Sequence, residues 1–195
     1  MTMTMTTVVD REIARGVRAV LREKRLDDAE DDFRWRSEPE LSRYDAARPL
    51  SMDYEEFLAL YREELQYPSQ YRRSLAIEDV AGKHIGNVMY YNIDAVHHEA
   101  ELGITIGEPD YWGKGYGTEA ARLLVERLLQ DLGFQRVYLK TLEWNHRARR
   151  SFAKAGFTEC GRAYRSGSSF ILMEIRREWL GRAEVDKAAL ATPVA

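Results

Sequence analysis

A turn with three alternating glycines, Trp112-Gly113-Lys114-Gly115-Tyr116-Gly117-Thr118, constrains the fold more than any other segment of this chain. Residues 99–106, just before it, alternate polar and apolar side chains, which is typical of a strand with one buried face. After the turn, apolar residues recur at helical spacing up to Gly133, where a helix C-cap is expected: Ala121, Leu124, Val125, Leu128 and Leu132. The sequence therefore predicts a strand, a glycine turn and a helix from residue 117 to residue 132.

A helix that begins in such a turn offers a site for an anion. Its first amide N–H groups have no partner within the helix, and the positive end of the peptide dipoles lies there. The glycines let the backbone approach the anion, Lys114 adds a positive charge and Thr118 adds a hydroxyl. The turn thus predicts a diphosphate site, while a plain tight connection is the alternative, because glycine is the usual turn residue.

Two other nucleotide-binding motifs resemble this turn in part. A Walker motif is absent, because Lys114 is followed by Gly115 where that motif needs Ser or Thr. A dinucleotide-binding motif has an acid about 20 residues beyond its glycines, and Glu143 lies near that position. However, the preceding strand is not apolar throughout, and few segments remain for a doubly wound sheet. The dinucleotide interpretation is kept as an alternative.

Length and charge limit the classes of protein. A chain of 195 residues with 45% hydrophobic residues can bury one core, so we expect a single domain over residues 11–180. Residues 1–10 and 181–195 are expected to be flexible ends. The net charge of -3 and the lack of a long basic run make a nucleic acid an unlikely main partner by charge alone.

Cysteine content and hydropathy bear on the compartment. Cys160 is the single cysteine, so no intramolecular disulfide forms and a reducing cytoplasm is predicted. We expect Cys160 to be a small buried hydrophobic residue rather than an acyl carrier. No stretch approaches the roughly 18 uninterrupted apolar residues of a membrane-spanning helix, so no membrane partner is expected.

The remaining segments predict an α+β order. The first is a strand over 17–22, followed by a helix that starts near residues 26–29 and a second helix over 54–64. Three strands over 71–78, 84–93 and 99–106 form a meander before the glycine turn. After the helix that follows the turn come a strand over 136–141, a helix over 145–155 closed by Gly156, and strands at 157 and 171–175.

Several motifs occur in the order found in one family. Ala100-Glu101-Leu102-Gly103-Ile104-Thr105-Ile106-Gly107 leads into the glycine turn, Asn145 and Ala148 follow, and Gly156-Phe157 closes the next helix. Near the end, Met173 is followed by Arg177-Glu178-Trp179. In these features the chain resembles the GNAT superfamily of acyl-CoA N-acyltransferases, in the branch similar to ribosomal-protein N-terminal (alanine) acetyltransferases. The resemblance is strongest over residues 86–179.

This resemblance implies a mixed, mostly antiparallel twisted sheet of about seven strands flanked by about four helices. The fourth and fifth strands would splay apart, and the pantetheine arm of acetyl-CoA would lie in the gap. The residues that would bind this cosubstrate are Ile104, Thr105, Ile106, Trp112, Gly113, Lys114, Gly115, Tyr116, Gly117, Thr118, Asn145 and Phe152. Trp112 departs from the Gln or Arg common in the family, and Asn145 is also a favoured helix N-cap residue.

Glu101 is the predicted catalytic residue. Strand parity places Glu101, Gly103 and Thr105 on the face opposite the apolar residues. An amine acceptor with a pKa near about 10 must lose a proton before it attacks, and Glu101 lies where the family carries a general base. The alternative is a solvent-facing strand glutamate. A bulge at Gly103 would free an N–H toward the thioester carbonyl, or this glycine only relieves a packing clash.

The sequence assigns the general acid and the acceptor contacts less completely. Phe152 occupies the position where family members carry a tyrosine acid, and Ser151 or His146 would have to substitute, unless both are only solvated side chains. The resemblance implies that the acceptor contacts come from the first two helices and a late loop. Those candidates are Trp35, Tyr44, Tyr54, Tyr90, Tyr91, Tyr164 and Arg165, although tyrosines also commonly serve the core.

The predicted function is acetyl transfer from acetyl-CoA to a primary amine, by direct attack in a ternary complex. No metal is expected, and the acceptor is a peptide N-terminus or a small amine. A homodimer is also predicted. The alternatives are a non-catalytic acyl-CoA-binding module, suggested by Phe152, and the dinucleotide-binding protein described above.

Overall fold

A computed structural model describes residues 11–180, and the predicted flexible ends at 1–10 and 181–195 lie outside the described residues. Eight strands form one sheet in the order β1-β2-β3-β4-β5-β6-β8-β7. The strands are β1 (Glu12–Arg15), β2 (Ala19–Glu23), β3 (Arg72–Asp79), β4 (His84–Asp94), β5 (Glu99–Ile106), β6 (Arg136–Leu142), β7 (Thr158–Arg165) and β8 (Ser168–Arg176). Among the strands of residues 11–180, only the β5–β6 pair is parallel. The predicted α+β class is confirmed, and the doubly wound alternative is wrong because that fold needs a mostly parallel sheet.

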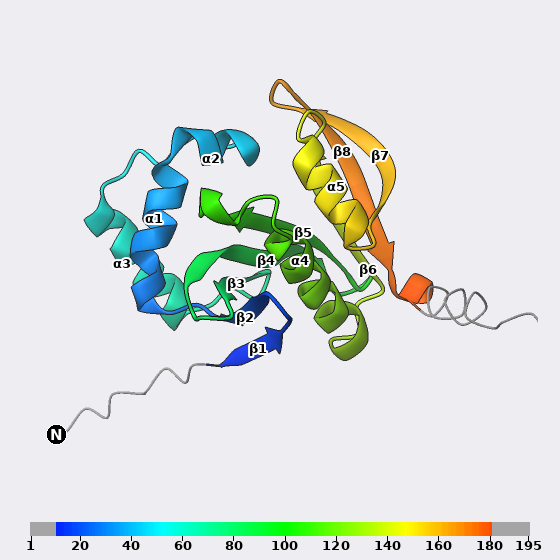
Figure 1. The fold of residues 1–195 in the computed structure, drawn as a ribbon, viewed down its shortest axis with the longest axis horizontal. Coiled ribbons are helices and arrows are strands. Elements are labelled where there is room, and N and C mark those ends of the chain that lie inside the picture. Colours follow the sequence, from blue (N-terminus) through cyan, green and yellow to red (C-terminus); the bar gives the residue numbers. More distant parts are fainter. Residues whose placement is uncertain (1–10, 181–195) are drawn as a thin grey trace, which may run out of the picture.

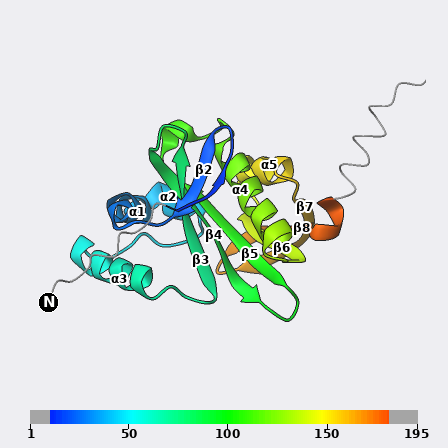
Figure 2. The same cartoon turned by 90° about the horizontal axis from the view of Figure 1, so that it is seen from below.

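Helices cover both faces of the sheet (Figures 1 and 2). One face carries α1 (Ala29–Ser37), α2 (Pro39–Tyr44) and α3 (Tyr54–Gln66). The other carries α4 (Tyr116–Glu126) and α5 (His146–Lys154). Short turns η1 (Leu26–Asp28) and η2 (Pro109–Tyr111) precede α1 and α4, and a π-helical turn η3 (Arg127–Asp131) extends α4. The main core lies under α4 and α5, and a smaller cluster of Ala29, Phe57 and Tyr61 lies under α1 and α3.

Two elements differ from the sequence prediction. The strand expected over 17–22 is a hairpin of β1 and β2, and Val17 is exposed in its turn. This adds an eighth strand, because a four-residue edge strand gives little periodic signal. The helix α2 was not predicted either. Its first turn contains Pro39, and proline is favoured at that position of a helix. The rest of the segment is short and polar, so it has no apolar periodicity that would predict a helix.

The sheet opens between β5 and β6. Their pairing covers Glu99 to Glu101 on β5 and Arg136 to Tyr138 on β6, and it stops there. Residues 102–106 of β5 and 139–142 of β6 therefore diverge, as the predicted splay requires. The register between β4 and β5 continues unbroken through Gly103, which pairs with Met89. A bulge at Gly103 is thus wrong, and the irregularity lies in β4 between Tyr91 and Asp94.

A buried ion cluster fixes the first helices to the sheet. Arg22 of β2 donates two 2.7 Å hydrogen bonds to Asp28 of η1 and one of 2.5 Å to Glu78 of β3. Burial alone would lower the pKa of Arg22, but the bonds to these two carboxylates raise it. Lys24 pairs with Asp32 of α1 at 2.7 Å. Each charge has a partner, which is the condition for ions to be tolerated in an interior.

We expect a Gly86→Ala substitution to destabilise the protein by about 1–3 kcal/mol, the usual cost of overpacking. A β-carbon at position 86 would lie 2.2 Å from the carbonyl oxygen of Thr105 on β5. Backbone cannot yield as a flexible side chain does, so β4 and β5 would have to separate. Urea unfolding measures the effect. Gly161→Ala is the control, because its β-carbon would meet only the side chain of Leu172 at 3.3 Å. Equal losses in both variants would contradict the prediction.

Candidate functional site

A cavity of about 860 Å³ occupies the opening between β5 and β6. Its lining includes Ile104 and Ile106, which face α4 and α5, and also Gly103 and Thr105, which face the opposite side. The cavity therefore passes through the sheet. We call the part beside α4 and α5 the anion half and the part beneath α2 the polar half.

The anion half begins at the N-terminus of α4. Gly113 has φ 73° and Gly115, the helix N-cap, has φ 93°. These left-handed conformations favour glycine, so the residue types follow from the backbone path. Because the N-cap residue is a glycine, no side-chain capping bond occupies the first backbone N–H groups of α4. These N–H groups lie at the end of α4 that borders the cavity. Five of the residues predicted to bind the cosubstrate line the cavity here: Gly113, Lys114, Gly115, Gly117 and Thr118.

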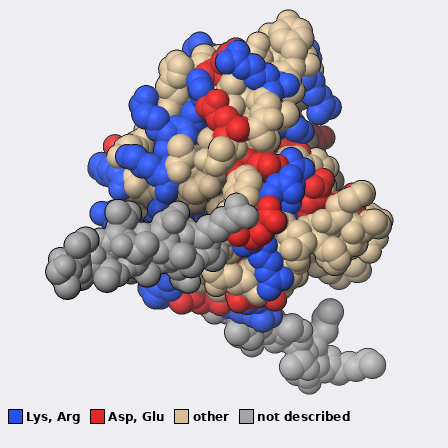
Figure 3. Space-filling model, turned by 90° about the vertical axis from the view of Figure 1, so that its right-hand side faces the viewer, with Lys and Arg blue, Asp and Glu red and all other residues tan. Residues whose placement is uncertain are grey.

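Positive charge predominates along the whole cavity. Within residues 11–180, eight basic side chains and two acidic ones, Asp45 and Glu119, line it. The basic residues are Arg18, Arg72, Lys114, Arg122, Lys140, Arg147, Arg150 and Lys154. By contrast, the outer face shown in Figure 3 carries basic and acidic side chains side by side. A polyanionic ligand would be attracted to the cavity.

Glu119 positions one of these cations rather than opposing it. Its carboxylate accepts hydrogen bonds from the backbone N–H groups of Val17, Arg18 and Ala19, at 2.6 to 3.1 Å. The β1–β2 turn is thereby held against α4, and Arg18 lies beside Gly115, with its Cδ 3.7 Å from where a β-carbon would be. The short hairpin thus contributes directly to the site.

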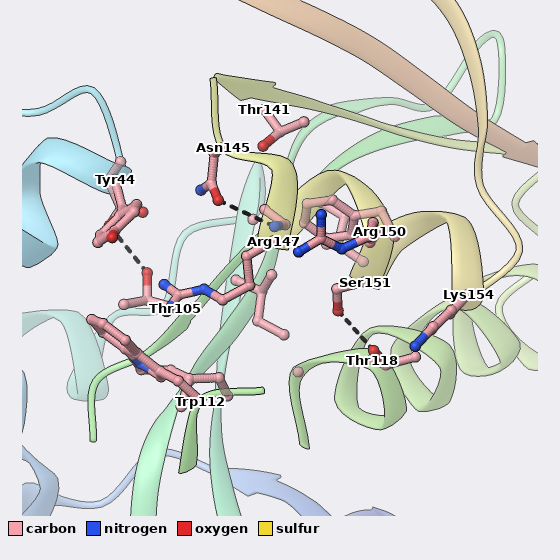
Figure 4. A pocket seen from close by; sticks show the side chains of 18 of the residues that line it. Tyr44, Thr105, Trp112, Thr118, Thr141, Asn145, Arg147, Arg150, Ser151 and Lys154 are labelled. Carbon is pink, nitrogen blue, oxygen red and sulfur yellow. Dashed lines mark hydrogen bonds between the residues drawn. The ribbon is translucent and has the colours of Figure 1, made fainter. Parts of the chain in front are cut away.

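Arg147 lies between two aromatic rings at the boundary of the two halves (Figure 4). Its guanidinium lies 3.9 Å from the ring centroid of Trp112 and 4.8 Å from that of Tyr44. The Trp112 Nε1 donates to the carbonyl oxygen of Ile106 at 2.7 Å. These contacts fix the loop to β5 and connect it with α2. Trp112, which is also among the residues predicted to bind the cosubstrate, lines the cavity.

The start of α5 completes the anion half. Asn145 accepts a hydrogen bond from the N–H of Ala148 at 3.1 Å, so it is a helix N-cap that also lines the cavity. The hydroxyls of Thr118 and Ser151 lie 2.8 Å apart and connect α4 with α5 (Figure 4). Phe152 lines the cavity but packs on Phe157, with no hydroxyl to donate a proton.

The polar half is formed by α2, β3, β4 and the opposite face of β5. Tyr44 and Asp45 reach it from the end of α2, Arg72 from β3, and Tyr91 from β4. Thr105 Oγ1 donates to Asp45 Oδ2 at 3.1 Å. Asp45 is exposed to the cavity, and partial desolvation of its carboxyl raises its pKa to about 6.

Glu101 is buried and does not line the cavity. Tyr91 Oη donates to it at 3.1 Å, Asn92 Nδ2 at 2.9 Å and Lys140 Nζ at 3.0 Å. Asn92 has φ 51°, within the β4 irregularity, which turns it toward Glu101. Tyr91 and Lys140 do line the cavity and stand between it and the carboxylate. The solvent-facing alternative for Glu101 is therefore wrong, and its carboxylate lies behind the residues that line the cavity.

Several predicted residues are not brought to the cavity. Trp35 is a core residue that packs on His84 with centroids 4.7 Å apart. Tyr90 packs on Phe134, and Tyr54 on Phe33. The side chain of Tyr116 packs on Tyr111. Outside the cavity lining are Trp35, Tyr54, Tyr90, Tyr116, His146, Tyr164 and Arg165.

Two exposed residues lie on the edge strand β7. Tyr164 is 76% exposed and does not line the cavity. Cys160 is also exposed, and its predicted burial is wrong. Both follow from β7 being the last strand of the sheet, with β8 as its partner on one side.

Residues that the sequence prediction missed include the cations of α5. Arg147, Arg150 and Lys154 share one helical face at spacings of three and four, a pattern that the sequence contains. Lys140 and Asp45 carry no such signal. Asp45 lies in a segment with no periodicity, and only the packing of α2 on the sheet brings it to Thr105.

The described part of the chain offers neither a cluster of metal ligands nor a membrane-spanning helix. Among residues 11–180, no group of three His, Cys, Asp or Glu side chains is placed to hold a metal ion. Within the same described range, no helix has the length and apolar character needed to cross a membrane.

A mixed sheet opened between two parallel-paired strands, with a glycine-turn helix at the opening, defines the acyl-CoA N-acyltransferase fold. The family model described as "Acetyltransferase (GNAT) domain" matches residues 18–158. The chain belongs to this family.

Curated relatives match over part of their length. YdaF of Bacillus subtilis (strain 168), named provisionally as a ribosomal N-acetyltransferase, is 31% identical over 107 residues, which cover 51% of this chain and 58% of YdaF. The spermidine N(1)-acetyltransferase of Escherichia coli (strain K12) is 35% identical over 77 residues, covering 40% of this chain and 41% of that enzyme. The chain thus matches about half the length of these relatives.

A solved structure shares the fold over most of the chain. The spermidine N-acetyltransferase of Vibrio cholerae, in complex with CoA and spermine, superposes with a TM-score of 0.74 at 21% identity. The superposition covers 84% of this chain and 98% of that one. At this identity the likeness concerns the fold alone.

Proposed function

We propose that this protein transfers an acetyl group from acetyl-CoA to a primary amine, by direct attack of the amine in a ternary complex. Family membership supports the reaction class. The cavity supports a ternary complex, because it can hold one ligand on each side of the opened sheet. Acetyl-CoA is the proposed cosubstrate, and the chemistry needs no metal.

The observation that carries this proposal is the passage through the sheet between β5 and β6. Its anion half joins a glycine-turn helix N-terminus to a set of basic side chains, which suits the pyrophosphate and the further phosphate of coenzyme A. From there, the unpaired stretch of β5 over 104–106 leads toward the polar half. The pantetheine arm lies along this stretch in the proposal and presents the thioester to the polar half.

The leaving group needs little assistance. A thiol with a pKa near about 8.5 departs as a thiolate more readily than an alkoxide. The absence of a tyrosine at Phe152 is therefore compatible with catalysis. We assign Glu101 a positioning role in the reaction, because it accepts hydrogen bonds from Lys140 and Tyr91 and so holds these two side chains at the cavity wall.

The acceptor is proposed as a cationic amine that loses its proton on binding. The relatives are named for ribosomal and spermidine N-acetylation, so a peptide N-terminus and a polyamine are the two candidate classes. A homodimer and a cytoplasmic location stay predictions.

An acceptor screen tests the proposal. We expect purified protein with acetyl-CoA to release free thiol only when an amine is present, at a rate on the order of 1 to 10³ per second for the best acceptor. The panel contains spermidine, an aminoglycoside and peptides with free N-termini. The same peptides with blocked N-termini are the control. Binding of acetyl-CoA without thiol release from any amine would favour the non-catalytic acyl-CoA-binding module.

A further inference from the structure

Asp45 differs from every other acidic group around the cavity. Glu119 is occupied by three backbone N–H groups, and Glu101 lies behind Tyr91 and Lys140. Asp45 lines the cavity directly and, within residues 11–180, has no basic side chain within ion-pairing distance. Its hydrogen bond is to the hydroxyl of Thr105. A carboxylate that faces the cavity and has no cationic partner among these residues suits a ligand that brings its own positive charge.

The position of Asp45 relative to β5 is also informative. Thr105 belongs to the stretch of β5 that has no partner in β6. Its neighbours Ile104 and Ile106 face the anion half, while Thr105 faces the polar half. Asp45 therefore reaches, from the acceptor side, the strand along which the acyl arm is proposed to lie.

We propose that Asp45 binds the ammonium group of the acceptor and acts as its general base. This proposal rests on the acetyl-transfer function proposed above and adds the residue that activates the amine. The ammonium transfers one proton to the Asp45 carboxylate. The neutral amine then attacks the thioester carbonyl, a C–N bond forms, the C–S bond breaks, and the departing thiolate receives the second proton of the nitrogen. Protonated Asp45 returns its proton to water.

The surrounding charges are compatible with this role. The groups that face the polar half are Tyr91 of β4, Arg72 of β3, Lys140 of β6 and Arg147 of α5. Arg72 pairs with Glu64, Lys140 with Glu101, and Arg147 lies over two aromatic rings. Burial, Glu101 and Asp45 together raise the pKa of Tyr91, so this hydroxyl stays protonated. With a pKa of about 6, Asp45 is ionised at neutral pH and remains basic enough to accept a proton.

The test compares Asp45→Asn with the wild type in the thiol-release assay, using the best amine from the acceptor screen. We expect kcat to fall on the order of 10²–10⁴-fold, the usual contribution of a general base. In the wild type, kcat/KM should fall below a pH of about 6, and the variant should lose this acidic limb. Glu40→Gln, an exposed acid on the same helix, is the matched control and should retain wild-type activity and pH dependence.

A second measurement does not depend on turnover. Because the folded-state pKa of Asp45 lies above its usual value of 3.8, the native state holds this proton more tightly, and stability is lost as pH rises through about 6. Asp45→Asn should therefore raise the melting temperature more at pH 8 than at pH 4.5. Its affinity for acetyl-CoA should stay unchanged, which also shows that the variant is folded.

The possible failures are distinguishable. An Asp45→Asn variant that keeps both its activity and its acidic limb would overturn the role of Asp45 and leave acetyl transfer intact. Loss of acetyl-CoA affinity in this variant would instead indicate a structural role and would also overturn it. A wild type that releases thiol with no amine would end the proposed function, and this proposal with it.

Discussion

A Gly117→Leu variant is expected to bind acetyl-CoA about 100-fold more weakly than the wild type, a loss of about 2.7 kcal/mol. Gly117 lies in the first turn of α4 and lines the anion half. A β-carbon there has space, with Ile106 Cγ1 at 3.5 Å and Ser151 Oγ at 4.0 Å, and the backbone is not left-handed. The helix therefore accepts a leucine, whose side chain would fill the space where the phosphates approach the amides. Isothermal titration calorimetry measures the affinity.

The control for Gly117→Leu places the same side chain nearby but outside the cavity. Ala153 is exposed on α5 and does not line the cavity, so Ala153→Leu should leave the affinity unchanged. Both variants should keep the wild-type melting temperature within a few degrees, because helices favour leucine over glycine and accept it nearly as well as alanine. Unchanged acetyl-CoA binding in Gly117→Leu would mean that the phosphates lie elsewhere.

An Asp28→Ala variant is expected to lose about 3–5 kcal/mol of unfolding free energy, the usual cost of removing one partner of a buried ion pair. Arg22 would keep Glu78 but lose two hydrogen bonds of 2.7 Å, and it is 3% exposed, so water cannot replace them. The cluster also attaches η1 and α1 to the sheet, and α2, which ends beside Asp45, is the next element in the chain. Urea unfolding measures stability, and amine KM reports on the polar half.

An exposed ion pair provides the control for Asp28→Ala. Glu12 and Arg15 interact at the surface of β1, with about half of each side chain exposed, so Glu12→Ala should cost no more than about 1 kcal/mol. A loss in Asp28→Ala as small as in the control would mean that Arg22 finds another partner. An unchanged amine KM in a destabilised variant would separate the cluster from the acceptor site.

The sequence prediction was most complete where a local pattern reports directly on the backbone. The glycines at 113 and 115 occupy left-handed conformations, and the amphipathic spacing from Ala121 onward reports the buried face of α4. The β5 alternation was equally informative about its faces. It was misleading about exposure: Glu101 does face away from the main core, but Tyr91, Asn92 and Lys140 cover it. Parity determines a direction, whereas burial depends on what packs there.

The acceptor side shows the opposite case. Of the candidate aromatics, Tyr44 and Tyr91 line the cavity, while Trp35 packs against His84 and Tyr90 against Phe134. An aromatic side chain serves a core and a binding surface equally well, so residue type alone could not separate them. Only the positions of the helices over the sheet did so.

The sequence by itself determined the α+β order of segments, the glycine-turn helix start and the strand that precedes it. These depend on interactions between residues close in the chain, such as helical spacing, strand alternation and backbone conformations that favour glycine. The tertiary structure alone decided that the cavity crosses the sheet, that Glu101 is covered, and that Asp45 meets Thr105 from 60 positions away. Such contacts depend on how α2 and the ion cluster beneath α1 pack on the sheet, and no local pattern in the sequence encodes them.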